Sequence, residues 1–259
     1  MIETPRPTPA ARERRSALAS LRAVVRLLFL SARVVGEARR GKLTREKVDL
    51  NCEMLGKGCL EDAQIELIVK GLDQLDLSKP YLFMSNHQSL YDIPILFAAL
   101  KGRLRMVAKK ELFKVPIWGQ ALQVAEFVSI DRKDRYKAVQ SLKEAARLMQ
   151  SGINVWMAPE GTRSRDGKLL PFKKGGFMLA LETGAQIVPV AINGAWTVIP
   201  PKSFRLRLGQ RVEVEFGAPI DASAFGVERR DALMREVREW MEARVSPETR
   251  VLSEPVGTP

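Results

Sequence analysis

The chain has 259 residues, a hydrophobic content of 46% and a formal net charge of +12. This length and composition fit one folded α/β domain with appendages and exclude a chain that is disordered over most of its length. The positive charge is concentrated in residues 1–50 and 101–176, which predicts a polyanionic partner: nucleic acid, an anionic membrane or a phosphorylated substrate.

Residues 1–14 contain three prolines and scattered charges, and we predict a flexible lead there. Residues 15–50 are predicted to be a helical, amphipathic segment. Five of its arginines fall on one narrow stripe of a helix, with aliphatic side chains opposite; they are Arg15, Arg22, Arg26, Arg33 and Arg40. The longest uncharged run, residues 27–32, is far too short to span a bilayer, and no secretory signal is recognisable.

Two arrangements fit this amphipathic pattern about equally well. The helix lies in the interfacial plane of a membrane, or it docks on the protein's own core with its arginines in water. The use of arginine throughout this stripe, and the lack of acidic residues four positions after Arg22 and Arg26, favour the membrane. We therefore expect a membrane-associating segment.

Residues 51–245 are interpreted as one α/β domain with a mixed, largely parallel sheet flanked by helices, because strands and helices alternate after a connecting region. Strands are predicted at 81–85, 104–108, 127–130, 153–157 and 187–192, and helices at 93–100, 116–122, 134–149, 175–182 and 229–243. Residues 205–208 and 212–216 are predicted to pair as a hairpin through Gly209. Residues 246–259 are predicted to be a loose tail.

Cysteine and histidine limit the chemistry. Cys52 and Cys59 are the only cysteines, and a single close pair is a poor disulfide framework and a poor zinc site. We expect two reduced thiols in a cytoplasmic protein and no metal site. His87 is the only histidine, so any imidazole chemistry belongs to this residue.

The first candidate site follows the predicted strand 81–85. His87 stands five residues before Asp92, so a turn between them is needed to bring the carboxylate to an imidazole N–H. That contact would leave the other ring nitrogen as a general base. Spacing alone fits a capping or packing histidine as well.

The second candidate is a basic loop after the predicted strand 153–157. It begins with Glu160, Gly161, Thr162 and Arg163 and continues through several lysines. Small residues allow a ligand to approach the backbone, and clustered cations suit phosphate oxygens. A solvated basic surface loop fits the composition equally well. The glycine and lysine spacing is not that of a P-loop.

The order and spacing of four segments resemble the glycerolipid acyltransferases of the 1-acyl-glycerol-3-phosphate (lysophosphatidic acid) type. The segments are Asn86-His87…Asp92, Val128-Ser129-Ile130-Asp131-Arg132, Ala158-Pro159-Glu160-Gly161-Thr162-Arg163 and Ile187-Val188-Pro189-Val190. The similarity runs from about residue 81 to residue 192. Glu126, Ser129 and Ala158 depart from the family pattern, which usually has Gly, Phe and Phe at these positions.

The resemblance implies an O-acyltransferase of phospholipid biosynthesis. A fatty acyl group would pass from an acyl-CoA or acyl-carrier-protein thioester to a lysophospholipid, in first place 1-acyl-glycerol 3-phosphate, giving phosphatidic acid. His87 would be the base and Asp92 its orienting partner. No cofactor beyond the thioester co-substrate is implied, and the expected location is the cytoplasmic face of a membrane.

The same resemblance implies the substrate-binding residues. Lys110, Arg132 and Arg163 would bind the acceptor phosphate. Glu160 would bond the glycerol portion or the waters that order it, and Gly161 and Thr162 of the same loop would also bind the substrate.

Two alternatives remain. The same chemistry could serve another acceptor, such as a lyso-aminolipid, lysophosphatidylcholine or glycerol 3-phosphate. The chain could also be a non-catalytic binder of anionic membrane or nucleic acid. Phe172 is the only aromatic residue of the basic loop and no base-reading motif occurs, so we expect no nucleic-acid partner.

Overall fold

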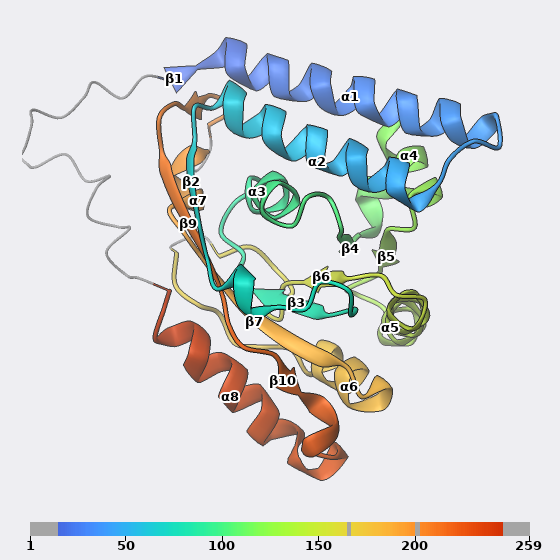
Figure 1. The fold of residues 1–259 in the computed structure, drawn as a ribbon, viewed down its shortest axis with the longest axis vertical. Helices are drawn as coiled ribbons and strands as arrows, with labels where there is room; N and C mark the ends of the chain where they lie inside the picture. The colour runs from blue at the N-terminus through green and yellow to red at the C-terminus, as the bar shows by residue number, and fades with distance from the viewer. Residues whose placement is uncertain (1–14, 165–166, 200–202, 246–259) are drawn as a thin grey trace, which may run out of the picture.

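The computed structural model describes residues 15–164, 167–199 and 203–245 (Figure 1). The predicted lead, 1–14, and the predicted tail, 246–259, lie outside these residues. The helices are α1 (Ala17–Arg39), α2 (Arg45–Asp62), α3 (Asp92–Ala99), α4 (Trp118–Val124), α5 (Arg135–Gln150), α6 (Lys174–Thr183), α7 (Ala195–Val198) and α8 (Arg230–Glu242). The strands are β1 (Arg15–Ser16), β2 (Glu66–Lys70), β3 (Leu82–Ser85), β4 (Arg105–Lys109), β5 (Val128–Ile130), β6 (Val155–Met157), β7 (Gln186–Asn193), β8 (Leu206–Arg207), β9 (Arg211–Phe216) and β10 (Ile220–Asp221).

One sheet organises the described chain. Its strands follow the order β2-β9-β7-β3-β6-β4-β5, and β10 pairs with β7. From β7 to β5 every neighbouring pair is parallel, as is β2 with β9, whereas β9 and β10 run antiparallel to β7. The predicted mixed, largely parallel sheet flanked by helices is therefore confirmed.

Helices cover both faces of this sheet, as Figure 1 shows: α1 to α4 lie on one side, and α5, α6 and α8 on the other. The side chains of the central strand β3 contribute to two hydrophobic cores, one on each face of the sheet. Successive side chains of a strand point to opposite faces. Phe83 thus packs in the core beneath α1 to α4, while Leu82 and Met84 pack in the core over α5 and α6. All three are fully buried.

Helix α1 docks on the protein itself and also keeps an exposed apolar face. Val34 and Val35 are buried in the core, and Arg26 pairs at 3.1 Å with Asp62 near the end of α2. The acidic partner that Arg26 lacks on its own helix is therefore supplied by a neighbouring one. Phe29, by contrast, is 66% exposed. No helix in the described ranges is both long enough and apolar enough to cross a membrane.

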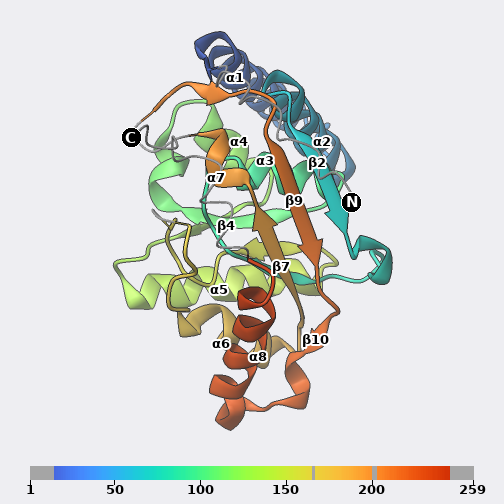
Figure 2. The same cartoon turned by 90° about the vertical axis from the view of Figure 1, so that its left-hand side faces the viewer.

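The predicted hairpin of residues 205–208 and 212–216 is wrong. Strand β8 pairs with β1, and β9 lies between β2 and β7 (Figure 2). Gly209 does turn the chain, with φ 71°, but its N–H donates to the carbonyl of Ala63. The buried side chains of Val212 and Val214 place β9 inside the sheet instead of in a local pair.

Strand β2 and most of helix α2 lie in the connecting region for which the sequence pattern predicts no element. Helix α2 also crosses the expected boundary between residues 50 and 51. Glycines weaken a helix pattern, yet Gly56 is required here by close packing. A Cβ at Gly56 would lie 2.6 Å from the backbone N of Ala98 and 2.7 Å from the carbonyl O of Pro94, both on α3. Such close contact between the two helices stabilises α2 more than its sequence pattern suggests.

Candidate active site

The turn between β3 and α3 carries the proposed reacting groups. Asn86 fixes the start of this turn, because its side-chain amide donates to the carbonyl of Ile192 and accepts from the same residue's N–H, both at 2.8 Å. The turn is thereby tied to β7, the neighbouring strand. His87 follows at the carboxyl end of β3, where α/β sheets place ligand-binding groups.

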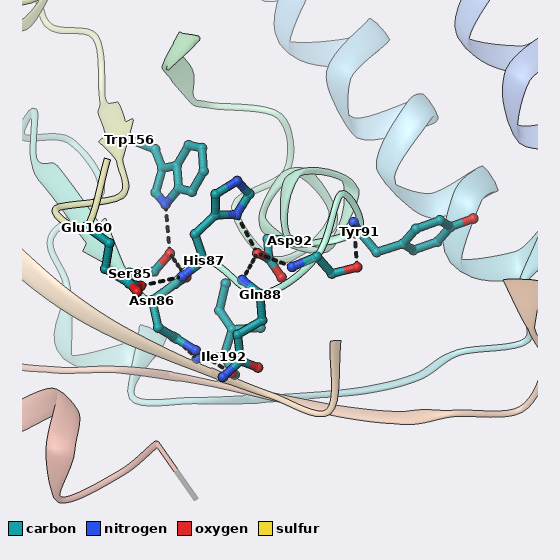
Figure 3. Close-up of polar contacts among 10 residues, drawn as sticks. Ser85, Asn86, His87, Gln88, Tyr91, Asp92, Trp156, Glu160 and Ile192 are labelled. Carbon is teal, nitrogen blue, oxygen red and sulfur yellow. Dashed lines mark hydrogen bonds and ion pairs between the residues drawn. The ribbon is translucent and has the colours of Figure 1, made fainter. Parts of the chain in front are cut away.

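His87 and Asp92 are in contact, as the motif requires. Nδ1 of His87 lies 2.7 Å from Oδ2 of Asp92, and the carboxylate is fully buried (Figure 3). Because a carboxylate accepts, Nδ1 carries the hydrogen and Nε2 keeps its lone pair. The imidazole retains 14% exposure, so the ring is reachable and not entombed. This arrangement suits a general base.

Backbone groups hold the Asp92 carboxylate in place. Its Oδ2 also accepts from the N–H of Gln88 at 2.8 Å and from that of Ser89 at 2.9 Å. These three donors explain how a five-residue spacing brings the pair together: the turn wraps around one carboxylate oxygen. The first residue of α3 is thus both a helix-terminal acid and the partner of the imidazole.

Trp156 on β6 supports the imidazole from the side. Its ring meets that of His87 edge-on, with centroids 5.8 Å apart and an interplanar angle of 83°. The indole N–H donates to Oγ of Ser85 at 2.9 Å, and that hydroxyl donates to the carbonyl of Asn86. Figure 3 shows Trp156 and Ser85 beside the imidazole ring of His87. Trp156 and Ser85 were not predicted, because only strand pairing brings them together.

The basic loop folds across the histidine turn. Glu160 is buried, and its carboxylate accepts from the N–H of His87 at 2.9 Å and from that of Leu170 at 2.8 Å. The N–H of Ser164 donates to the carbonyl of His87 at 2.8 Å. Burial raises the pKa of Glu160, and the two backbone hydrogen bonds oppose this rise. Glu160 therefore ties the loop to the turn, a role beyond the predicted glycerol contact.

The predicted cationic residues lie at the same edge of the sheet but in different surroundings. Lys110 and Arg132 follow β4 and β5, the outer strands on the side of β6. Lys110 donates to Asp131, and this hydrogen bond raises its pKa, so it stays charged at neutral pH. Arg163 is exposed and lines the apolar cavity described next, together with Gln88.

Gly161 and Thr162 follow the buried Glu160 and precede the exposed Arg163. Gly161 has φ 68°, and its N–H donates to the carbonyl of Ala158 at 3.0 Å. A Cβ on Gly161 would lie 2.7 Å from the side chain of Lys173. Thr162 is exposed. The tight turn at Gly161 places Thr162 and Arg163 on the surface of the loop.

A cavity of about 950 Å³ extends from this site beneath α1 and α2. Its lining includes Ala23 and Leu30 of α1, Leu55 of α2, Phe97 of α3 and Leu122 of α4. Gln88 and Arg163 also line it, next to the histidine turn. An apolar cavity with polar groups at one end suits a long hydrocarbon chain attached to a reactive head. Sequence reasoning gave no sign of this cavity, because most of α2 lies in the connecting region for which no element is predicted.

Comparisons with known proteins agree on one family. Residues 66–193 match the family model described as Acyltransferase. The 1-acyl-sn-glycerol-3-phosphate acyltransferase LPAT1, chloroplastic, of Arabidopsis thaliana is 35% identical over 171 residues, covering 66% of this chain and 46% of that protein. The human 1-acyl-sn-glycerol-3-phosphate acyltransferase alpha is 34% identical over 178 residues, covering 68% and 62%. The match thus spans between about half and two thirds of these relatives' length.

A solved structure is similar over nearly the whole chain. The crystal structure of the 1-acyl-sn-glycerophosphate (LPA) acyltransferase PlsC from Thermotoga maritima superposes with a TM-score of 0.74 at 27% identity. The alignment covers 93% of this chain and 97% of that chain. The similarity therefore includes the α1–α2 layer as well as the sheet.

Proposed function

This chain belongs to the glycerolipid acyltransferase family, and we propose that it moves a fatty acyl group from a thioester to the free hydroxyl of a lysophospholipid. The acceptor is in first place 1-acyl-glycerol 3-phosphate, which gives phosphatidic acid. The donor is an acyl-CoA or an acyl-carrier-protein thioester. The observation that carries the proposal is the 2.7 Å contact between His87 and Asp92 beside an apolar cavity.

His87 acts as the general base. Its Nε2 takes the proton of the acceptor hydroxyl while that oxygen attacks the thioester carbonyl carbon. The carbon–sulfur bond then breaks, and the leaving thiolate receives the proton from the imidazolium. Asp92 holds Nδ1–H throughout and stabilises the imidazolium. A positioned base contributes about 10²–10⁴ in rate, and the positioning of both substrates supplies much of the remainder.

Arg163, Arg132 and Lys110 bind the acceptor phosphate in this proposal. Guanidinium and ammonium groups form charge-assisted hydrogen bonds to phosphate oxygens. Arg163 has the best position of the three, because Arg163 and Gln88 both line the cavity and Gln88 is the residue after His87. Lys110 would exchange or share its bond to Asp131 when phosphate binds.

The acyl chain occupies the cavity beneath α1 and α2. Each buried CH₂ group contributes about 0.8 kcal/mol, so a long chain gains much of its affinity there. The cavity can hold a chain of this kind because its volume is about 950 Å³ and its lining is predominantly apolar.

Helix α1 would bring the enzyme to its lipid substrates at the cytoplasmic face of an anionic membrane. Leu21 and Phe29 are 58% and 66% exposed on its outer face, and Arg22 and Arg33 are also exposed. Apolar side chains beside arginines fit the interface between acyl chains and anionic headgroups. The enzyme would thus be peripheral, with its cavity open to substrates in the bilayer.

Thiol release tests the proposal. Purified protein is incubated with acyl-CoA and lysophosphatidic acid, and the liberated free thiol is measured. Turnover is expected, and His87→Ala should reduce it at least about 10²-fold, since the base is lost. Asp92→Asn should also lower kcat strongly, because the amide no longer stabilises the imidazolium.

The acceptor panel and a fold control complete this test. Glycerol 3-phosphate, lysophosphatidylcholine and a lyso-aminolipid are compared with lysophosphatidic acid at equal concentration. Circular dichroism checks that both variants keep the wild-type fold. Full activity in a folded His87→Ala protein would refute the catalytic assignment, and a preference for another acceptor would replace the proposed one.

A further inference from the structure

The basic loop that carries Arg163 is closed at its base by two hydrogen bonds. The N–H of Lys173 donates to the carbonyl of Pro159 at 2.7 Å, and the N–H of Leu170 donates to the Glu160 carboxylate at 2.8 Å. Arg163 lies between these paired residues in the chain and is exposed. Its position therefore depends on how firmly the base of the loop is held.

A further contact holds the base of this loop from the C-terminal helix α8. Nη1 of Arg238 donates to the carbonyl of Leu170 at 2.9 Å. The Arg238 guanidinium also lies 5.2 Å from the ring centroid of Phe172, and Phe172 stacks on Phe177 of α6. A planar guanidinium can donate a hydrogen bond and stack on a ring at the same time. Arg238 thus holds the loop at two nearby positions.

Consecutive hydrogen bonds connect Arg238 to the backbone of His87. Leu170 accepts from Arg238 through its carbonyl and donates through its N–H to Oε2 of Glu160. Oε1 of Glu160 accepts from the N–H of His87 at 2.9 Å, and the N–H of Ser164 donates to the carbonyl of His87 at 2.8 Å. Both backbone polar groups of His87 are therefore bonded to the loop that Arg238 holds.

Helix α8 is docked on the protein by other residues. Leu233, Val237 and Met241 follow one another at intervals of four residues, and all three are fully buried in the core over α5 and α6. Arg238 keeps a side chain that is 33% exposed. Since the apolar stripe anchors the helix, the contacts of Arg238 are not needed to dock it. They serve the loop instead.

We propose that Arg238 is a positioning residue for acceptor binding, because it fixes the loop from which Arg163 binds the acceptor phosphate. This inference rests on the proposed acyltransferase function. Arg238 acts through Leu170 and Phe172 and is assigned no contact with either substrate. A loop that is held before the substrate arrives loses less conformational entropy on binding. None of the four motif segments includes α8.

Steady-state kinetics separates positioning from a merely structural role. Arg238→Ala should raise the acceptor KM about tenfold and leave the donor KM unchanged, because a small displacement of a binding group weakens its hydrogen bonds strongly. Arg238→Lys keeps a charged donor but cannot stack in the same way, so it should raise the acceptor KM by a smaller factor. Both constants are measured by thiol release at varied acceptor and donor concentrations.

Arg235→Ala is the matched control. Arg235 is exposed on the same helix, so its substitution removes the same charge without touching the loop contacts of Arg238. It should leave both KM values unchanged. Circular dichroism and Tm identify the variants that keep the fold, and Arg238→Lys provides the measurement if alanine destabilises the protein.

A double-mutant cycle tests whether Arg238 acts through Arg163. If it does, Arg238→Ala has little left to weaken once Arg163 is gone. The acceptor KM of the double variant Arg163→Ala/Arg238→Ala should therefore equal that of Arg163→Ala within about twofold. A product of the two single effects overturns this route.

The remaining outcomes are distinct. An unchanged acceptor KM in the folded Arg238 variants overturns the positioning role. A lower kcat with both KM values unchanged also overturns it, because that result indicates a smaller fraction of folded enzyme. If the wild-type protein releases no thiol with any acceptor, the acyltransferase function itself is refuted.

Discussion

The Asp92 carboxylate shows how one residue can organise a reacting group. Three donors converge on its Oδ2: the imidazole of His87 and the backbone N–H groups of Gln88 and Ser89. Because the backbone donors hold the oxygen, the carboxylate in turn holds the ring in one tautomer. Charge-assisted bonds of this kind are about twice as strong as neutral ones. The proposed base is thus positioned before a substrate arrives.

Arg163 offers the sharpest residue-scale prediction. We expect Arg163→Ala to raise the acceptor KM about 10- to 100-fold, because a charge-assisted hydrogen bond to phosphate is lost. The donor KM should change much less. Both constants are measured by thiol release at varied acceptor and varied donor concentrations.

An exposed arginine elsewhere serves as the control for this experiment. Arg147 on α5 has a side chain that is 77% exposed and pairs with Glu144 of its own helix. Arg147→Ala removes the same charge and should leave both KM values unchanged. A larger effect of Arg163→Ala on the donor KM than on the acceptor KM would remove Arg163 from the phosphate site.

At the scale of the element, α1 has two apolar faces in different surroundings. Its inner face packs on the body through residues such as Val34 and Val35, whereas its outer face exposes large apolar side chains. A helix with a single apolar stripe buries that stripe against one partner. Helix α1 still exposes a second apolar surface after it has packed on the rest of the protein. The two arrangements expected from sequence are therefore compatible within one helix.

Vesicle flotation tests the outer face of α1. We expect the double substitution Leu21→Ser and Phe29→Ser to weaken binding to anionic vesicles at least tenfold, because each inserted large apolar side chain contributes about 1.5–3 kcal/mol. The fold should be preserved, since both positions are exposed. Tyr136→Ser is the control: Tyr136 is 74% exposed on α5, across the sheet. Flotation that equals that of the control would contradict a membrane role for α1.

Glu126 illustrates how one element is joined to another at the cost of local strain. The family pattern usually has glycine at this position, and here the residue has φ 63°, where a side chain is disfavoured. Its carboxylate accepts two hydrogen bonds of 2.8 Å from Arg45 at the start of α2. The bidentate pair links α2 to the segment before β5 and offsets the strained backbone.

At the scale of the whole molecule, the cavity lies between segments that are far apart in sequence. Residues of α1, α2, α3 and α4 line it, together with Gln88, Leu90 and Tyr91 of the histidine turn. A ligand that fills it should bind only the folded protein. Ligand binding should therefore increase the free energy of unfolding.

Thermal unfolding measures this linkage. A non-hydrolysable long-chain acyl-CoA thioether at about 100 times its Kd should add about 2.7 kcal/mol and raise Tm by about 5–10 °C. The acetyl analogue at the same concentration lacks the chain and should give a much smaller shift. Equal shifts would mean that the chain does not enter the cavity.

The sequence alone determined the class of fold and predicted the contact between His87 and Asp92. Alternating apolar strands and amphipathic helices predicted a mixed, largely parallel sheet, because the two periodicities differ. The helix predicted at 134–149 agrees with α5, which Asp134 caps through its side chain. The contact between His87 and Asp92 could also be predicted, because both residues belong to one short turn and no distant segment is needed to form it.

Tertiary structure decided what depends on partners distant in sequence. Helix α2 contains Gly56, which its contact with α3 explains, and β9 pairs with β2 and β7 because its buried side chains complete the sheet. The partner of Arg26, the support of His87 by Trp156, and the cavity arise in the same way. Local patterns report which face of an element is apolar, but packing decides what that face contacts.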